Sequence, residues 1–150
     1  MELTKRGDYA VRAMLALARA PGGRLTSVRL IAEEMSIPVR FLPHVMGDLA
    51  AAGLVEATTG RAGGYRLARP AAAIALLDVI EAVEGDSRRR TCVLRGGPCG
   101  LDGYCDVHDI FFAAQDAMLG TLAAASLADL PVRRGGRRAG PDERPAGEGE

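Results

Sequence analysis

Three cysteines and one histidine are the residues of this chain whose types and spacing could support chemistry. Cys92, Cys99 and Cys105, the only cysteines in the 150 residues, lie in the Gly-rich stretch TCVLRGGPCGLDGYCDVHD, and His108 follows the last of them. The spacing is C-x6-C-x5-C-x2-H. Thiolates and imidazoles bind metals, and a thiolate beside a base is a nucleophile. The stretch therefore indicates a disulfide, a catalytic thiol or a metal site.

The spacing favours some of these chemistries over others. Structural zinc sites usually contain C-x2-C pairs, and the sequence has none. A catalytic thiol needs a neighbouring base, which His108 could supply to Cys105, but Cys92 and Cys99 would then have no use. Three thiolates spread over a Gly-rich loop suit an iron–sulfur cluster, which presents several metal atoms to its ligands. A thiol–disulfide switch and a zinc site stay open as alternatives.

Composition limits the kind of protein that carries these cysteines. Apolar residues make up 48% of the chain and aromatic residues 4%, which allows one packed domain, or a small domain with a helical extension, built from Ala- and Leu-rich helices. No apolar run reaches the roughly 18 residues of a membrane span, and the first residues lack the apolar segment of a signal peptide. We therefore expect a cytoplasmic protein, in which an odd cysteine count favours metal or redox chemistry.

Charge is unevenly distributed along a chain whose net charge is zero. Residues 1–70 contain 10 basic and 6 acidic side chains, whereas residues 71–130 contain 4 and 9. Residues 131–150 contain 5 and 4. A polyanionic partner is therefore expected to meet the first part of the chain, although this asymmetry does not identify nucleic-acid binding by itself.

Apolar residues at helical spacing predict three helices in that first part. The first is expected over residues 4–20, ended by the PGG sequence that follows it. The second begins at Thr26 or Ser27, either of which can cap it. After the turn at residues 36–38, a third helix runs to Gly53, and Pro43 is tolerable only in its first turn. Two helices of this length joined by a short turn indicate a helix-turn-helix.

A β-hairpin is predicted directly after the third helix. Its strands are expected at residues 54–57 and 65–68, around a turn-rich tip. Glycines at the tip allow the backbone to approach a phosphate closely, and nearby arginines supply positive charge; these residues are Gly60, Gly63, Gly64, Arg61, Arg66 and Arg69. A hairpin in this place is typical of a DNA-binding wing, whereas the alternative is an ordinary hairpin with solvated arginines.

The remainder of the chain is expected to contain two helices and a tail. A helix is predicted over residues 71–83, followed by the cysteine loop and a long helix that starts near Asp106. The apolar stripe of that long helix would pack against a second copy of the chain, and packing within its own chain is the alternative. Residues 131–150 lack apolar content and are expected to be disordered. The predicted divisions are thus residues 1–70, 71–130 and 131–150.

In this order, the segments resemble the IscR/NsrR family of winged-helix transcription regulators. The matching stretches are LTKRGDYAVRAMLALA, IAEEMSIPVRFLPHVMGDLAAAGLVEATTGRAGGYRLAR, LLDVIEAVEG and the three-cysteine loop, and together they span residues 1–130. The resemblance implies a mainly α fold: a winged helix-turn-helix DNA-binding domain, then a cysteine loop and a long dimerisation helix. It also implies a homodimer, not an enzyme, that binds double-stranded operator DNA as a repressor or an activator, of which we expect a repressor. An iron–sulfur cluster would gate its affinity by sensing redox state, nitric oxide or cluster supply.

The resemblance also implies which residues hold the cluster. Cys92, Cys99 and Cys105 match the three cysteine ligands, although the first gap is one residue longer than the commoner C-x5-C-x5-C spacing. His108 matches the fourth ligand of a 2Fe–2S site, and Asp8 matches the fourth ligand that the other subunit supplies to a 4Fe–4S site. We expect His108 and a 2Fe–2S cluster. The rivals are a cluster-free thiol–disulfide regulator and a Cys105–His108 enzyme, for which no substrate-pocket motif is present; we expect no small-molecule substrate and no membrane partner.

DNA-contacting residues follow from the same positions in the fold. The amino-terminal residues of the third helix should enter the major groove, where Arg40 is the one long donor and could read guanine. The acidic base-reading residue of IscR-like proteins is replaced by Pro43, so the operator cannot be inferred from theirs. The second helix and the wing should contact phosphates and the minor groove. The expected DNA-contacting residues are Ser27, Arg29, Val39, Arg40, Phe41, Arg61 and Gly63.

Overall fold

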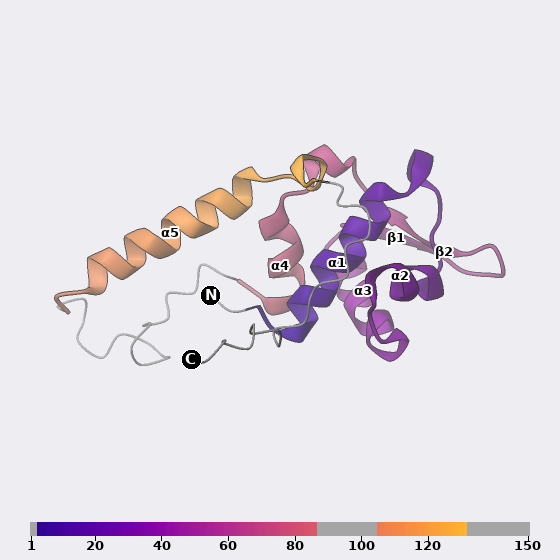
Figure 1. The fold of residues 1–150 in the computed structure, drawn as a ribbon, viewed down its shortest axis with the longest axis horizontal. Helices are drawn as coiled ribbons and strands as arrows, with labels where there is room; N and C mark the ends of the chain where they lie inside the picture. The colour runs from indigo at the N-terminus through magenta and orange to yellow at the C-terminus, as the bar shows by residue number, and fades with distance from the viewer. Residues whose placement is uncertain (1–2, 87–104, 132–150) are drawn as a thin grey trace, which may run out of the picture.

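The computed structural model describes residues 3–86 and 105–131 of the chain. Figure 1 shows a small helical body with a β-hairpin at one end and one long helix that projects from it. The α-helices are α1 (Lys5–Arg19), α2 (Val28–Met35), α3 (Leu42–Ala51), α4 (Leu76–Glu84) and α5 (His108–Ala124). The strands are β1 (Val55–Thr58) and β2 (Gly64–Leu67). Short 3₁₀ turns are η1 (Pro21–Gly23), η2 (Val39–Phe41), η3 (Ala71–Ala73) and η4 (Leu127–Asp129).

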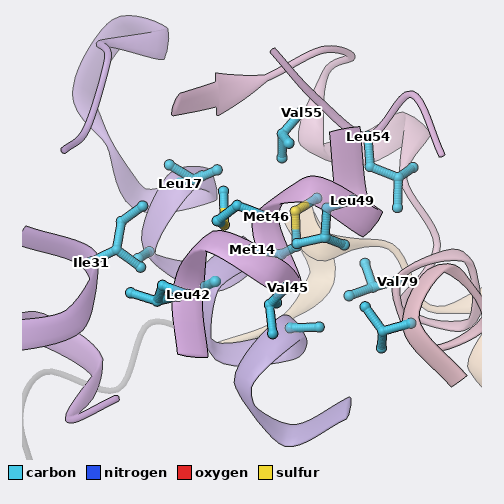
Figure 2. Close-up of a cluster of buried hydrophobic side chains, with 14 of the residues drawn as sticks. Met14, Leu17, Ile31, Leu42, Val45, Met46, Leu49, Leu54, Val55 and Val79 are labelled. Atoms are coloured by element: carbon cyan, nitrogen blue, oxygen red, sulfur yellow. The ribbon is translucent and has the colours of Figure 1, made fainter. Parts of the chain in front are cut away.

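Helix α1 is the centre of the body. The hydroxyl of Thr4 accepts a hydrogen bond from the Gly7 N–H at 3.3 Å and caps the helix, and the Pro21-Gly22 turn lies just beyond its last residue. One face of α1 is fully buried and packs against α2, α3 and α4. Figure 2 shows Met14 of this face among side chains from the surrounding elements. The buried core therefore fixes α2 and α3 relative to α1.

The predicted helix-turn-helix is confirmed. The hydroxyl of Ser27 caps α2 by accepting from the Leu30 N–H at 3.3 Å, and Ser36 ends α2 in a left-handed conformation with φ of 53°. Pro43 lies in the first turn of α3, where its missing N–H costs nothing. Helix α3 buries Leu42, Val45, Met46 and Leu49.

The wing is also present, with strands one residue away from the predicted ones. Strand β1 pairs with β2 in antiparallel register from Val55↔Leu67 to Thr58↔Gly64. Thr26, just before α2, adds a bridge to the hairpin, since its N–H and carbonyl bond the carbonyl and N–H of Tyr65 at 2.8 and 2.9 Å. The wing is therefore fixed to the start of α2.

The prediction of one helix over residues 71–83 is wrong. Instead, η3 ends at Ala73, residues 74–75 are extended, and α4 begins at Leu76. The side chain of Ile74 is fully buried, and Ala75 forms a bridge with Ser126. Leu127 N–H donates to the Ile74 carbonyl at 3.0 Å. This pairing with the segment after α5 and the burial of Ile74 override the helix propensity of an Ala-rich stretch.

Helix α5 starts two residues later than predicted and projects from the body (Figure 1). Leu119 is its one buried residue, and α5 contacts α4, whereas Ile110 is 70% exposed and Phe111 38% exposed. In the described residues, the apolar stripe is thus not covered by its own chain. No helix within residues 3–86 or 105–131 is long and apolar enough to cross a membrane.

The core joins the first two predicted divisions. Ile74, Val79, Val83 and Leu127 belong to the same buried cluster as the residues of α1 and α3. The boundary at residue 70 remains a prediction, as does the tail, because residues 132–150 lie outside the described part of the chain.

Candidate DNA interface and cluster site

The predicted DNA-contacting residues lie on elements at one end of the molecule. Figure 1 shows α2, α3 and the β1–β2 hairpin together at the end opposite to the start of α5. Arg29 is exposed at the second position of α2, Arg40 is exposed in η2, and Arg61 is exposed at the tip of the wing. Three arginines on three neighbouring elements therefore face solvent at this end of the molecule.

The turn that precedes α3 differs from the prediction in detail. Val39, Arg40 and Phe41 form a separate 3₁₀ turn, η2, rather than the first residues of the helix itself. Val39 is 50% exposed and Phe41 is 40% exposed, so two apolar side chains face solvent beside Arg40. The Arg40 guanidinium lies over the Phe41 ring, 4.8 Å from its centroid. Arg40 is thus oriented by an aromatic neighbour as well as exposed.

Glycine is required at the wing tip by backbone contacts. A Cβ on Gly63 would lie 2.2 Å from the Thr58 carbonyl oxygen, and the Gly63 N–H donates to the Gly60 carbonyl at 3.1 Å. That N–H is therefore used inside the turn. Arg66 of β2 is paired with Glu56 of β1 through an Nε–Oε2 hydrogen bond of 2.9 Å. Arg61, at the tip of the wing, is exposed to solvent.

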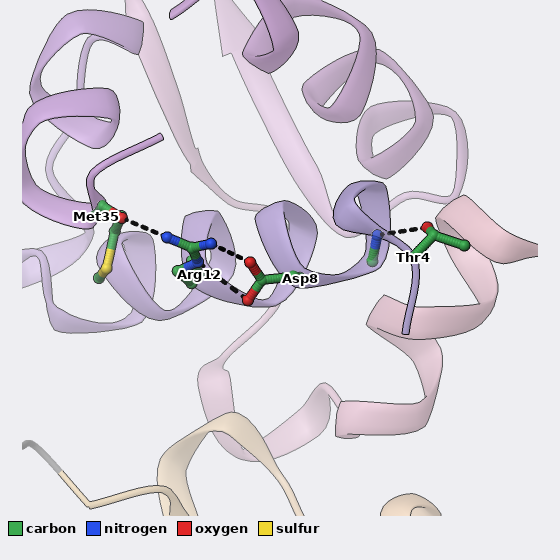
Figure 3. Close-up of polar contacts among 5 residues, drawn as sticks. Thr4, Asp8, Arg12 and Met35 are labelled. Carbon is green, nitrogen blue, oxygen red and sulfur yellow. Dashed lines mark hydrogen bonds and ion pairs between the residues drawn. The ribbon is translucent and has the colours of Figure 1, made fainter. Parts of the chain in front are cut away.

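Asp8, a candidate cluster ligand, is already paired. Its carboxylate forms an i,i+4 ion pair with Arg12 that includes an Nε–Oδ1 hydrogen bond of 3.1 Å (Figure 3). Arg12 also donates from Nη1 to the Met35 carbonyl at 3.0 Å. The Asp8–Arg12 pair therefore ties α1 to the last residue of α2, at the helix-turn-helix turn.

Cys105 and His108 lie together at the start of α5. The His108 N–H donates to the Cys105 carbonyl at 2.9 Å, and the Cys105 thiol is free and partly exposed. The His108 ring contacts the Phe112 ring at a centroid distance of 4.2 Å, and among the described residues nothing bonds its ring nitrogens. Cys92 and Cys99 lie outside the described residues, in which no group of three or more metal-binding side chains occurs.

Two polar contacts that the sequence reasoning missed join α1 and its cap to neighbouring helices. Thr4 donates from both its N–H and its hydroxyl to Oε1 of Glu84, each at 2.8 Å. Arg6 forms an ion pair with Asp48 of α3. Glu84 is the last residue of α4, the helix that precedes the cysteine loop in the chain. The first contact therefore connects the end of α4 to the start of α1, and the second connects α1 to α3. Nothing local in the sequence signals pairs so distant along the chain.

Helix-turn-helix, wing and exposed arginines together define a winged-helix DNA-binding protein. Over residues 3–132 the chain matches the Rrf2 family model, described as an iron-dependent transcriptional regulator. The chain belongs to the Rrf2 family and is a transcription regulator, not an enzyme. The resemblance to the IscR/NsrR regulators is thereby confirmed.

Relatives and solved structures agree with this assignment. The chain is 36% identical over 135 residues to the protein aau3 of Rhizobium meliloti, a match that covers 89% of this chain and 87% of that protein. It is similar in structure to CymR, the global cysteine regulator of B. subtilis, with a TM-score of 0.73, 26% identity and coverage of 86% and 95%. T. potens IscR is similar with a TM-score of 0.67, 26% identity and coverage of 86% and 85%.

Proposed function

We propose that this protein is a homodimeric repressor whose affinity for an operator depends on an iron–sulfur cluster. We propose that it acts in the cytoplasm. The observation that carries the proposal is the proximity of Cys105 and His108 at the start of α5, a helix with an exposed apolar stripe, in a chain of the Rrf2 family. A thiolate and an imidazole three residues apart are donors that iron–sulfur clusters use.

Specific contacts with DNA are assigned to the exposed residues of α2, η2 and the wing. Ser27 and Arg29 stand at the start of α2, where a helix N-terminus and a guanidinium suit phosphates. Arg40 reaches a base edge from η2, and Arg61 reaches the minor groove from the wing tip. Val39 and Phe41 supply apolar contact, and Gly63 permits the close approach of the tip.

Dimerisation is assigned to α5. Ile110 and Phe111 of α5, together with Val107 just before it, form an exposed apolar stripe that would be costly to leave in water. A second copy of the same helix buries that stripe and places two recognition elements for two half-sites. The partner that covers the apolar stripe of α5 is thus a second copy of this chain.

Cys92, Cys99 and Cys105 would hold the cluster, with His108 as the favoured fourth ligand of a 2Fe–2S site. His108 fits because its ring nitrogens are not bonded within the described residues, whereas the Asp8 carboxylate is paired with Arg12. Asp8 of a second subunit, as ligand of a 4Fe–4S site, is the alternative, and it requires that ion pair to break. When bound, the cluster supplies a redox- and nitric oxide-sensitive centre.

Coupling from this site to DNA would run through α1. The cysteine loop follows α4 in the chain, and the carboxylate of Glu84, the last residue of α4, binds Thr4; α1 in turn is paired to α3 through Arg6 and Asp48. A change of the loop that shifts the end of α4 would therefore reach α3 through two polar contacts. A dimer amplifies such a shift because both half-sites must match at once.

Two variants test the cluster-gated repressor. Operator binding is measured by gel shift with anaerobically purified protein, before and after removal of the cluster, for wild type, Cys99→Ser and Cys105→Ser. We expect cluster-dependent binding in wild type and none of that dependence in either variant. Unchanged regulation in both variants would rule out gating by these cysteines.

Similarity to CymR, the global cysteine regulator of B. subtilis, favours one second candidate. In it, Cys92, Cys99 and Cys105 form reversible disulfides and bind no metal. That regulator shows a gel shift that responds to oxidant and thiol, with no iron in the purified protein, so iron content separates the two candidates.

A further inference from the structure

A stack of two rings and two guanidinium groups connects α1 to the turn before α3. The Tyr9 and Phe41 rings lie with their centroids 5.7 Å apart at an interplanar angle of 33°. The Arg12 guanidinium lies 5.3 Å from the centroid of Tyr9, and the Arg40 guanidinium lies 4.8 Å from the centroid of Phe41. The order is therefore Arg12, Tyr9, Phe41, Arg40, and it ends at the arginine assigned to the bases.

The turn η2 needs such a support. It is three residues long, has no side-chain cap, and contains the exposed Val39. A 3₁₀ turn has poorer hydrogen-bond geometry than an α-helix, so side-chain packing helps to fix its conformation. Phe41 is 40% exposed and contacts both the Tyr9 ring and the Arg40 guanidinium. The Tyr9 ring is thus an aromatic platform, contributed by α1, on which the turn rests.

The other end of the stack is held by polar contacts. Arg12 binds Asp8 through an ion pair and donates to the Met35 carbonyl at 3.0 Å. The position of Arg12 is therefore fixed by α1 itself and by the end of α2. Because Tyr9 is half-buried against the hydrophobic core, the ring between these groups has little freedom to move.

We propose that Tyr9 is a positioning residue for base reading: its ring holds Phe41, and through Phe41 the Arg40 guanidinium, in the orientation that enters the major groove. This inference rests on the proposed function, in which Arg40 reads a base. A long arginine side chain loses conformational freedom when it binds, and a platform that orders it beforehand reduces that loss. Tyr9 touches no base in this arrangement and acts through its neighbours.

A double-mutant cycle tests the inference with the full chain. The probe is a duplex enriched by wild type from a random-sequence library, and a scrambled duplex of equal length measures non-specific binding. The proteins are wild type, Tyr9→Leu, Tyr9→Phe, Phe41→Leu, Arg40→Ala and the Tyr9→Leu/Arg40→Ala pair. Thermal unfolding of each verifies the fold, and Phe41→Leu breaks the stack from its other side if Tyr9→Leu does not fold.

We expect Tyr9→Leu to weaken binding of the enriched duplex by about tenfold, the scale of one base contact, with binding of the scrambled duplex unchanged. Phe41→Leu removes a proposed DNA contact as well as the stack, so it should weaken binding of the enriched duplex at least as much. Tyr9→Phe keeps the ring and should bind like wild type. The paired variant should bind no more weakly than Arg40→Ala, since Tyr9 acts through Arg40.

Contrary outcomes distinguish a failure of the positioning role of Tyr9 from a failure of the DNA readout by Arg40. If Arg40→Ala weakens binding but Tyr9→Leu does not, or if the two losses add, the positioning role is wrong while Arg40 still reads DNA. Equal weakening on both duplexes also overturns it. If wild type enriches no sequence, or Arg40→Ala binds like wild type, the assigned readout fails and the positioning role fails with it.

Discussion

The carboxylate of Glu84 accepts two hydrogen bonds from Thr4, since the Thr4 N–H and hydroxyl both lie 2.8 Å from Oε1. Glu84 is the last residue of α4, and Thr4 is the cap of α1. This contact thus joins the start of α1, the central helix, to the end of α4, the helix that precedes the cysteine loop in the chain. It is the first link in the proposed path from the loop to DNA.

Replacing Glu84 by Ala should weaken that link. The two hydrogen bonds at a solvent-exposed site are worth about 1 kcal/mol of unfolding free energy, so denaturant unfolding should show a loss on that scale. The difference in operator affinity between cluster-bound and cluster-free protein should also shrink. Glu84→Gln retains Oε1 as an acceptor and is the matched control. Gating at full strength in the Ala variant would exclude Glu84 from the path.

Gly7→Ala should fail to stabilise α1, although an Ala normally improves a helix interior by about 1 kcal/mol over Gly. A Cβ on Gly7 would lie 2.2 Å from Oε1 of Glu84, so the carboxylate would have to leave Thr4. Gly47→Ala in α3 is the control, because nothing lies within 4 Å of its Cβ position. Chemical denaturation should show a gain for Gly47→Ala alone, and for Gly7→Ala only when Glu84→Ala is also present. A gain for Gly7→Ala by itself contradicts the close contact.

Ile110→Glu should convert the dimer to a monomer. Ile110 is the most exposed large apolar side chain of α5, and a carboxylate there would be buried without a partner in the dimer. Asp116→Arg, six residues further along and outside the stripe, changes charge without entering the interface. Light scattering after size-exclusion chromatography measures the mass. A dimer for Ile110→Glu would show that the two chains meet elsewhere.

The segment after α5 contributes a pH dependence through Asp129. Hydrogen bonds from the Ser126 hydroxyl and N–H lower the pKa of the Asp129 carboxyl. A carboxyl whose pKa is lower in the folded state stabilises it above the unfolded pKa, and that contribution is lost as pH falls through the folded value. Ser126→Ala should raise the pKa of Asp129 towards its ordinary value in an NMR titration. An unmoved pKa would mean that the hydroxyl does not bind this carboxylate in solution.

Local signals explain why much of the fold could be predicted from the sequence. Ser27 as a cap, Pro43 in a first turn and the glycines of the wing are each read from neighbouring residues. The extended Ile74–Ala75 segment could not be read that way, because it is set by pairing with Ser126 and Leu127, about fifty residues later. An Ala-rich stretch without that partner looks helical.

In the candidate site too, contacts between residues close in sequence could be predicted, whereas contacts between separate elements could not. Asp8 and Arg12 stand at helical i,i+4 spacing, so their ion pair could have been inferred, and it weakens the case for Asp8 as a ligand. The stack of Tyr9 on Phe41 joins residues from two elements and has no local signal. The ligand roles of Cys92, Cys99, Cys105 and His108, and the DNA contacts, stay predictions.

Iron and acid-labile sulfide per chain, measured on protein purified without oxygen and combined with operator binding before and after cluster removal, test the central claim most directly. We predict about two of each per chain for a 2Fe–2S site with His108, or about four if Asp8 completes a 4Fe–4S site, and an operator affinity that changes when they are removed. Folded, dimeric protein with neither iron nor sulfide, or an affinity that their removal leaves unchanged, would contradict it.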